Sequence, residues 1–269
     1  MMARKRIGII GMGYVGTAMH RFFECHYDMV AYDPGKNLPA TKDDINACDL
    51  VCVCVPTPPG ADGSCDTSIV EDAIRWIAAP LILIKSTVEI GTTDRLRQVT
   101  GKRVVFSPEY CGESSYWTPY KFHTDIKETP FFIFGGDPKD TSACVDYFLK
   151  VTGPVKTYRQ TSALAAEMAK YMENTFYATK ITFCYEIATL CEKAGIDFNE
   201  VRELWLLDPR INPMHTAVFK ENKLPFSGKC LPKDLAALIG YAKQNDYRPA
   251  LLEEVSASNH RLGQIRSAK

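Results

Sequence analysis

Two side chains of complementary chemistry lie one helical turn apart near the middle of the chain. Lys170 and Asn174 fall within a helix predicted for residues 162–194, and their spacing of four places them on one face of it. An ammonium group beside an amide can hold a substrate oxygen and stabilise negative charge that develops on it. We therefore expect an oxyanion site here; a solvated helix face is the alternative.

Cys230 lies outside the apolar runs that hold several of the ten cysteines. It occupies a loop just before a helix predicted for residues 234–244, and Lys233 follows closely. A helix N-terminus and a nearby ammonium both lower the pKa of a thiol. A thiolate at this position could attack a carbonyl carbon and form a covalent intermediate. We expect a nucleophile; an inert, packed cysteine is the alternative.

A glycine-rich turn joins the first predicted strand to the first predicted helix. Gly11 permits the tight turn, Gly13 lets a pyrophosphate approach the backbone, and Gly16 lets the helix pack on the strand. The helix opens with Tyr14 and Val15, where free N–H groups and the helix dipole attract phosphates. The turn therefore predicts a dinucleotide site.

An acidic residue ends the next predicted strand. Asp33 can accept hydrogen bonds from both hydroxyls of an adenosine ribose. Its charge would repel a 2′-phosphate, so the sequence favours NAD over NADP. A glycine turn without a ligand and a flavin site are the alternatives.

Short apolar runs alternate with helical patterns over the first part of the chain. Strands are predicted at residues 6–10, 29–33, 49–55, 81–86, 103–107 and 131–136. This alternation predicts a doubly wound, parallel, Rossmann-type sheet. Thr87 and Glu109 each follow a strand, where carboxyl ends line the ligand crevice, although Thr87 could instead cap the next helix. Ser68 and Glu71 have the spacing of a capping box.

Only helices are predicted after about residue 160. The helix over residues 162–194 stops at Gly195, and Asp197 with Glu200 suits the start of the next helix. Two further helices are predicted at residues 234–244 and from residue 249 to the end. We therefore expect an α/β fold with a Rossmann domain at 1–160 and an all-helical domain at 161–269.

Charge and cysteine content limit the partners. The 32 basic and 32 acidic residues give no net charge, so no global field attracts nucleic acid or an anionic membrane. No apolar stretch approaches the roughly 18 residues that a membrane span needs, and no signal peptide is visible. Ten cysteines without a Cys-x-x-Cys pair favour reduced thiols in the cytoplasm and no metal site.

Together with further stretches, these residues resemble the UDP-glucose/GDP-mannose dehydrogenase family over nearly the whole chain. The motifs are Gly11–Gly16, Val55-Pro56-Thr57-Pro58, Lys85–Val88 with Gly91-Thr92, Pro108-Glu109, Lys170 with Asn174, and Gly228-Lys229-Cys230-Leu231-Pro232-Lys233-Asp234. Members of this family are NAD-dependent enzymes that oxidise the C6 alcohol of a nucleotide sugar to a carboxylate. The resemblance implies NAD as the cofactor and a nucleotide sugar as the substrate.

The resemblance also implies a role for each catalytic group. Cys230 would be the nucleophile, Lys170 and Asn174 the oxyanion-stabilising pair, and Asp234 the residue that assists their proton transfers. The alcohol would be oxidised to an aldehyde, captured by the cysteine as a thiohemiacetal, oxidised again to a thioester and hydrolysed. This scheme requires the sulfur of Cys230 and the amine of Lys170 to converge beside the nicotinamide ring.

Water and cofactor contacts follow from the same resemblance. Thr87 and Glu113 resemble residues that position the catalytic water, and Glu109 lies with them. The expected cofactor contacts are Gly11, Gly13, Tyr14, Val15, Gly16, Asp33, Pro56, Thr57, Thr87 and Glu109.

Two departures from the family bear on the substrate. The family carries a third domain that holds much of the nucleotide sugar, and this sequence stops at about the end of the preceding helix. The family often has Phe-Leu-Arg-Glu-Gly after Pro-Glu, where this chain has Tyr110-Cys-Gly-Glu113-Ser. The approach to the cysteine also differs, with Pro225-Phe-Ser-Gly228-Lys in place of Gly-Phe-Gly-Gly-Ser.

Two other functions stay open at this point. A two-electron hydroxyacid dehydrogenase shares the NAD domain and a helical domain with Lys and Asn at this spacing, but needs no nucleophilic cysteine. A truncated, non-catalytic NAD-binding relative is the second. In all cases we expect a homodimer, because the helix at 163–194 has more apolar surface than a small domain buries and the family dimerises through it.

Overall fold

The computed structural model describes residues 4–60, 63–111, 125–219, 222 and 224–267. The chain divides into two compact units. The first comprises residues 1–58 and 65–170, and the second comprises residues 59–64 and 171–269.

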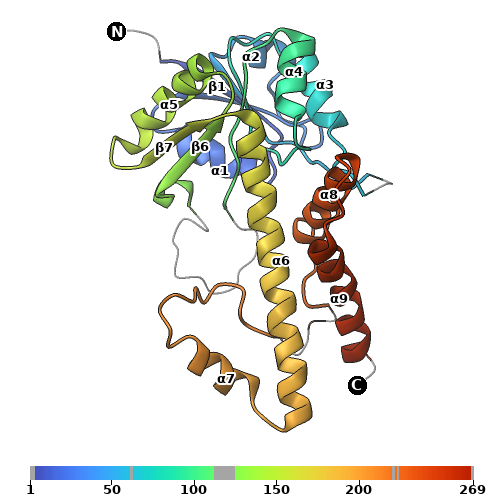
Figure 1. Ribbon diagram of the computed structural model, residues 1–269. Helices are drawn as coiled ribbons and strands as arrows, with labels where there is room; N and C mark the ends of the chain where they lie inside the picture. Colours follow the sequence, from blue (N-terminus) through green and yellow to red (C-terminus); the bar gives the residue numbers. More distant parts are fainter. Residues whose placement is uncertain (1–3, 61–62, 112–124, 220–221, 223, 268–269) are drawn as a thin grey trace. The chain divides into compact units, whose positions relative to one another are not determined.

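The first unit is built on a seven-stranded sheet of order β2-β1-β3-β4-β5-β6-β7 (Figure 1). Its strands are β1 (Arg6–Ile10), β2 (Asp28–Tyr32), β3 (Leu50–Val53), β4 (Ile82–Ile84), β5 (Val104–Phe106), β6 (Phe131–Gly135) and β7 (Thr157–Thr161). The predicted doubly wound sheet followed by helices is confirmed. One detail differs, because β6 runs antiparallel to β5 while every other neighbouring pair is parallel.

Helices cover both faces of this sheet. They are α1 (Tyr14–Phe23), α2 (Lys42–Asn46), α3 (Ser68–Trp76), α4 (Thr92–Thr100) and α5 (Pro138–Thr152), with a 3₁₀ turn, η2 (Ile126–Glu128). Strand side chains alternate between the faces. Ile7 and Ile9 pack with α1 and α5 on one face, whereas Ile10 packs with α2, α3 and α4 on the other. The two apolar layers fix the register of each strand.

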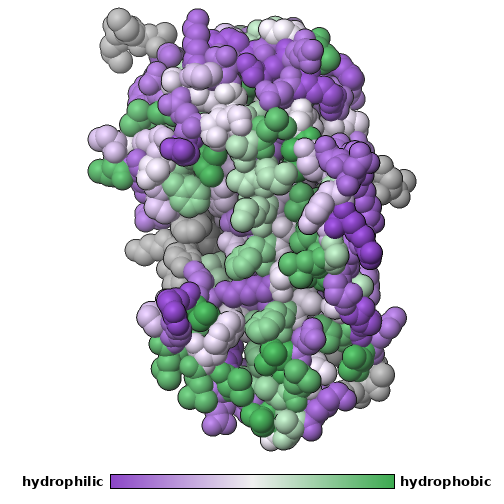
Figure 2. Space-filling model, viewed as in Figure 1, coloured by the Kyte–Doolittle hydropathy of each residue, from purple (hydrophilic) through white to green (hydrophobic). Residues whose placement is uncertain are grey.

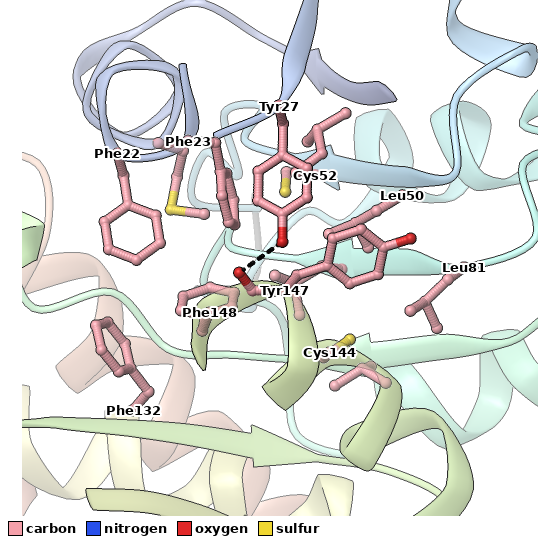
Figure 3. Packing of buried hydrophobic residues seen from close by; sticks show 14 of the residues in the cluster. Phe22, Phe23, Tyr27, Leu50, Cys52, Leu81, Phe132, Cys144, Tyr147 and Phe148 are labelled. Carbon is pink, nitrogen blue, oxygen red and sulfur yellow. Dashed lines mark hydrogen bonds between the residues drawn. The ribbon is translucent and has the colours of Figure 1, made fainter. Parts of the chain in front are cut away.

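Aromatic side chains dominate the core under α1 and α5 (Figure 3). The Phe148 ring contacts those of Phe22 and Phe23 at centroid distances of 5.1 and 5.2 Å. Tyr27 donates its hydroxyl to the carbonyl of Tyr147 at 3.0 Å, so its polar end is satisfied in the interior. Each buried ring of this kind contributes roughly 1.5–3 kcal/mol.

The chain reverses its winding direction at β1, which has β2 on one side and β3 on the other. The glycine turn leaves the carboxyl end of β1 at this point. Gly11 has φ +85°, and a Cβ on it would lie 2.6 Å from the carbonyl oxygen of Cys54. A Cβ on Gly16 would lie 1.9 Å from the carbonyl oxygen of Gly11, so α1 packs on the turn only with glycine there.

The second unit is helical. It contains α6 (Ala163–Ala194) from residue 171 onward, α7 (Phe198–Trp205), α8 (Leu231–Gln244) and α9 (Ala250–Ser267). Its core joins Ala178 of α6, Leu235 of α8 and Val255 of α9 to Phe226 in the loop before α8. As predicted, α6 ends at Gly195, which has φ +72°, and Asp197 caps α7.

Two predicted helix starts need correction. The N-cap of α3 is Thr67 rather than Ser68, whose N–H donates to the carboxylate of Asp66 at 2.9 Å. The Thr67 hydroxyl bonds the side chain of Glu71, so no capping box forms at Ser68. Helix α8 begins at Leu231, three residues earlier than predicted, because proline is well tolerated in a first helical turn.

Among the described residues, the elements α2, α5, β7 and η2 lie outside the predicted set, and α4 is expected only as the helix that follows Thr87. They lengthen the alternation of strands and helices without changing the architecture. No helix in the part of the chain that the structure describes is long and apolar enough to cross a membrane.

The two glycines of the α1 turn make opposite predictions for stability. Gly16→Ala should lower the free energy of unfolding by about 3 kcal/mol or more, because its methyl group overlaps the Gly11 carbonyl. Gly13→Ala should lower it by less than about 1 kcal/mol, because a Cβ there meets no atom within 4 Å. Urea denaturation of both variants measures this, and equal losses would contradict the described turn.

Candidate functional site

The first turn of α1 fits a pyrophosphate. Gly13 is the N-cap, and because it has no side chain it makes no capping hydrogen bond to the first turn of the helix. The space above Gly13 is open to at least 4 Å, and the side chain of Tyr14 is exposed. The backbone N–H groups of a first helical turn beside open space, at the carboxyl end of β1 where the winding reverses, fit the expected anion cradle.

Asp33 has a structural task in addition to its predicted one. Its two carboxylate oxygens accept the N–H groups of Met12 and Gly35 at 2.8 and 2.9 Å. The carbonyl of Met12 accepts a hydrogen bond from the ammonium group of Lys36. Each carboxylate oxygen still has a lone pair for a ribose hydroxyl. The carboxylate thus holds the glycine turn from the adjacent strand end.

The carboxyl ends of β3 and β4 bring Thr57 and Thr87 together. The Thr57 hydroxyl donates to the Thr87 carbonyl at 2.8 Å, and the thiol of Cys65 lies 3.4 Å from the same oxygen. Thr87 does not cap the next helix, because the N-cap of α4 is Gly91. Pro56 sets the backbone just before Thr57. This arrangement leaves the Thr87 side chain half-buried at the strand end.

A buried ion pair lies at the ends of β4 and β5, where sequence reasoning assigned no role to Lys85. Its ammonium is 3.2 Å from the Glu109 carboxylate and donates to the Pro108 carbonyl at 3.1 Å. The other Glu109 oxygen accepts the N–H groups of Tyr110 and Cys111. Burial alone would raise the pKa of Glu109, but Lys85 and these N–H groups outweigh it and lower the pKa.

Glu167 ties α6 to the sheet. Its side chain is fully buried and accepts the Gly91 N–H at 2.6 Å and the N–H and hydroxyl of Thr93 at 3.0 and 2.6 Å. It therefore caps α4, whose own N-cap residue has no side chain. Burial raises the pKa of Glu167, and the hydrogen bonds only partly oppose this.

Lys170 lies one turn after Glu167 and is 9% exposed. Its ammonium is 4.9 Å from the centre of the Tyr110 ring. Asn174 follows one turn later and is 7% exposed. The solvated-face alternative is therefore wrong for both residues.

A polar network in the second unit joins α6 to α8. The Asn174 amide donates to one oxygen of Asp234 at 2.5 Å, and the Lys233 ammonium is 2.6 Å from the other. Asp234 is 1% exposed, so its charge is held entirely by these neighbours and the helix start. The Lys233 ammonium pairs with Asp234, and the effect of Lys233 on Cys230 stays a prediction.

Cys230 is the N-cap of α8 and is exposed, whereas seven of the ten cysteines are buried. Its carbonyl accepts the N–H of Asp234 at 2.9 Å, the first bond of the helix. The inert-packing alternative is wrong for this thiol. A thiolate at a helix N-terminus is stabilised by the helix dipole.

The loop before Cys230 is fixed by a residue that sequence reasoning did not identify. Asn259 of α9 is buried, accepts the Phe226 N–H at 3.0 Å and donates to the Phe226 carbonyl at 3.1 Å. Gly228 then turns the chain with φ +89°. No local signal in the sequence points to Asn259, because its partner is more than thirty residues away.

Not every predicted site residue can be placed. Glu113 lies outside the described residues. Lys170 closes the first unit and Cys230 belongs to the second, so their convergence stays a prediction. Within the described ranges, no group of three or more His, Cys, Asp or Glu side chains could hold a metal ion.

Fold and site together define a dinucleotide-binding protein of the dehydrogenase class. Two family models match it: "UDP-glucose/GDP-mannose dehydrogenase family, NAD binding domain" at residues 28–136, and "UDP-glucose/GDP-mannose dehydrogenase family, central domain" at residues 164–261. Together they cover more than half of the chain. The chain belongs to the UDP-glucose/GDP-mannose dehydrogenase family, and NAD is the cofactor of its first unit.

Individual relatives agree with this assignment. The chain is 29% identical to the UDP-glucose 6-dehydrogenase TuaD of Bacillus subtilis, over 96% of this chain and 63% of that protein. A UDP-glucose dehydrogenase structure from Pyrobaculum islandicum is 25% identical, with a TM-score of 0.78 over 96% of this chain and 68% of that one. The chain thus spans less than two thirds of the Bacillus enzyme.

A shorter protein shares the fold over its full length. The 3-hydroxyisobutyrate dehydrogenase of Mycobacterium tuberculosis has a TM-score of 0.71 over 99% of both chains. At 16% identity this likeness shows the fold alone.

Lys85→Met tests the buried ion pair. It should lower the free energy of unfolding at pH 7 by about 3–5 kcal/mol, because a buried carboxylate loses its counter-ion. In the wild type the pKa of Glu109 is lowered, so its contribution is present above the unfolded pKa and is lost as pH falls. In the variant burial raises that pKa, so the variant gains stability on acidification. Urea titrations should show that the difference in free energy of unfolding between the wild type and Lys85→Met becomes smaller as the pH falls from 7 to about 4.

The double variant Lys85→Met/Glu109→Gln is the matched control, because it removes both charges. It should be more stable at pH 7 than Lys85→Met alone. A gap between the wild type and Lys85→Met that is constant with pH would contradict the ion pair.

Proposed function

We propose that this protein oxidises the primary alcohol of a nucleotide sugar to a carboxylate, with NAD as the cofactor and Cys230 as a covalent nucleophile. The observation that carries this proposal is the buried hydrogen bond between Asn174 and Asp234. It connects the helix of the oxyanion pair to the helix that Cys230 begins. A purely structural helix pair gains little from burying a carboxylate and an amide when apolar side chains would fill the space.

Each group has a defined task in this reaction. NAD, when bound by the first unit, would supply the hydride acceptor for both oxidations. Lys170 and Asn174 hold the reacting oxygen and stabilise its negative charge, first on the alcohol and then on the adduct. The Cys230 thiolate forms a bond to the aldehyde carbon and gives a thiohemiacetal, which the second oxidation converts to a thioester. Water then displaces the sulfur, releasing the carboxylate and restoring the thiol.

Three further groups complete the proposed site. Thr87 and Glu113 position the hydrolytic water, and Asp234 accepts a proton in the cysteine or lysine cycle. The balance is one alcohol, one water and two NAD to one carboxylate, two NADH and three protons. The nucleophile is needed because a free aldehyde is a poor hydride donor, whereas a tetrahedral adduct with an oxyanion is a good one.

We assign the cofactor contacts to the first part of the chain, 1–160, and catalysis and dimerisation to 161–269. The proposed contacts are Gly11, Gly13, Tyr14, Val15, Gly16, Asp33, Pro56, Thr57, Thr87 and Glu109. For Glu109 the ion pair with Lys85 favours an indirect role, through the backbone of Tyr110 and Cys111. The buried thiols favour a reducing compartment, the cytoplasm.

The ratio of NADH to the oxidised sugar product, carboxylate or aldehyde, tests the function. With a panel of UDP- and GDP-sugars, the wild type should give a ratio near two for its substrate. Cys230→Ser should stop after the first oxidation, because no thiol captures the aldehyde, and carboxylate formation should fall by a factor of at least about 100. If Cys230→Ser produces carboxylate at the wild-type rate, the four-electron scheme is wrong.

Two outcomes point to the other functions. A ratio near one with an unaffected Cys230→Ser variant indicates a two-electron dehydrogenase. That function is favoured only by the fold it shares, over the full chain, with the Mycobacterium protein. NAD binding by calorimetry without turnover on any sugar indicates a non-catalytic relative.

We also propose a homodimer. Large apolar side chains are exposed along one face of α6 and near the end of α7, and Figure 2 shows the hydrophobic surface over these elements. They are Met172, Phe176, Phe183, Leu190, Leu204 and Leu207. The α6 members are spaced by four and seven residues, so they form one stripe. Contiguous exposed apolar surface of this kind marks an interaction site.

Phe183→Glu combined with Leu190→Glu tests the dimer. Two charges in the stripe should convert the protein to a monomer, measured by light scattering at a fixed micromolar concentration, because dimer formation depends on protomer concentration. Val155→Glu is the matched control, because Val155 is an exposed apolar residue on the first unit. A wild type that is monomeric under these conditions would exclude the dimer.

A further inference from the structure

The Tyr110 ring lies directly beside the ammonium of Lys170. The Nζ atom is 4.9 Å from the ring centre, within the roughly 6 Å over which a cation is attracted to an aromatic face. Lys170 is nearly buried, so this attraction acts with little screening by water. We propose that Tyr110 is a positioning residue for Lys170: its ring seats the ammonium where the reacting oxygen binds. The inference rests on the proposed function for the role of Lys170.

The ring itself is held from two directions. It makes a T-shaped contact with the ring of Phe131, the first residue of β6, at a centroid distance of 5.0 Å and an interplanar angle of 68°. The backbone N–H of Tyr110 donates to Glu109 at 2.8 Å, and Lys85 fixes that carboxylate. Contacts that start at the buried ends of β4 and β5 therefore hold the Tyr110 ring in place. A seat built in this way holds its position without help from a ligand.

The stem of the lysine is fixed at its other end. Glu167 lies three residues earlier on α6 and is bound to the first turn of α4 by three hydrogen bonds. This bond set determines the rotation of the helix about its axis at Lys170. The Tyr110 ring adds a contact near the tip of the flexible side chain, which favours one rotamer of the lysine.

The ring, rather than the hydroxyl, is the part that acts in this proposal. The face of a phenylalanine ring carries the same negative potential, so Tyr110→Phe keeps the cation–π contact with the Lys170 ammonium. Tyr110→Leu keeps apolar bulk but removes the π face. The pair of variants separates the cation–π contact from hydrophobic packing and from any hydrogen bond of the hydroxyl.

The closing experiment measures the reactivity of Lys170 without turnover. Each protein is treated with N-hydroxysuccinimidyl acetate, and acetylation of every lysine is followed by mass spectrometry. Tyr110→Leu should raise the rate of acetylation of Lys170 on the order of tenfold, because the amine reaches solvent more often without the contact to the ring. Tyr110→Phe should change that rate by less than about twofold. Lys150, which lies 4.7 Å from the Tyr27 ring, is the internal control and should not change in either variant.

Unchanged Lys170 labelling in folded Tyr110→Leu, or an equal rise in Tyr110→Phe, overturns the proposal. If circular dichroism shows that Tyr110→Leu does not fold, Tyr110→Met, which is unbranched, takes its place with the same expected result. If the wild type oxidises a sugar, Tyr110→Leu should lower kcat about tenfold and leave the KM for NAD unchanged. Tyr110→Phe should keep the wild-type kcat. Labelling needs no activity, so a protein that oxidises no sugar refutes the proposed function and still decides this inference.

Discussion

The buried carboxylate of Glu167 is the constraint on which the arrangement of the candidate site depends. A carboxyl group without solvent is costly unless its oxygens are hydrogen-bonded, and three donors from the start of α4 reach this one. Because the cap works in only one geometry, it fixes both the position and the rotation of the start of α6. Lys170 follows one turn later on the same helix, so its direction is set by a contact that it does not itself make.

Buried polar contacts also fix the other segments that carry candidate site groups. These groups lie at the ends of strands and helices, and the contacts hold those ends in place. Asp33 holds the glycine turn, Lys85 and Glu109 hold the turn after β5, and Asn259 holds the loop before Cys230. Each contact holds a segment that carries a group with a proposed role. These groups are the N–H groups of α1, the ring of Tyr110 and the exposed thiol of Cys230. Rigid supports of this kind lower the reorganisation that a transition state requires.

Much of this could be predicted from sequence, for reasons that are local. Apolar runs of strand length, the glycine spacing and the stop at Gly195 predict the sheet and the long helix, because each reports on backbone geometry at its own position. The residues around Cys230 likewise predict a loop before a helix, outside the apolar runs. Strand direction leaves no trace in an apolar run, so the antiparallel β6 was missed. The cap by Glu167 joins residues 74 positions apart, and Lys85 is hidden in an apolar run; neither has a local signature.

The central claim is that the carboxylate forms through a covalent bond to one sulfur. Acid quenching during turnover, followed by mass spectrometry of the peptide that contains Cys230, tests it most directly. The account predicts a sugar acyl group on Cys230, formed only with NAD and the substrate present. Carboxylate formed at full rate by protein whose Cys230 has already been alkylated, or an acyl group on a different residue, would contradict it.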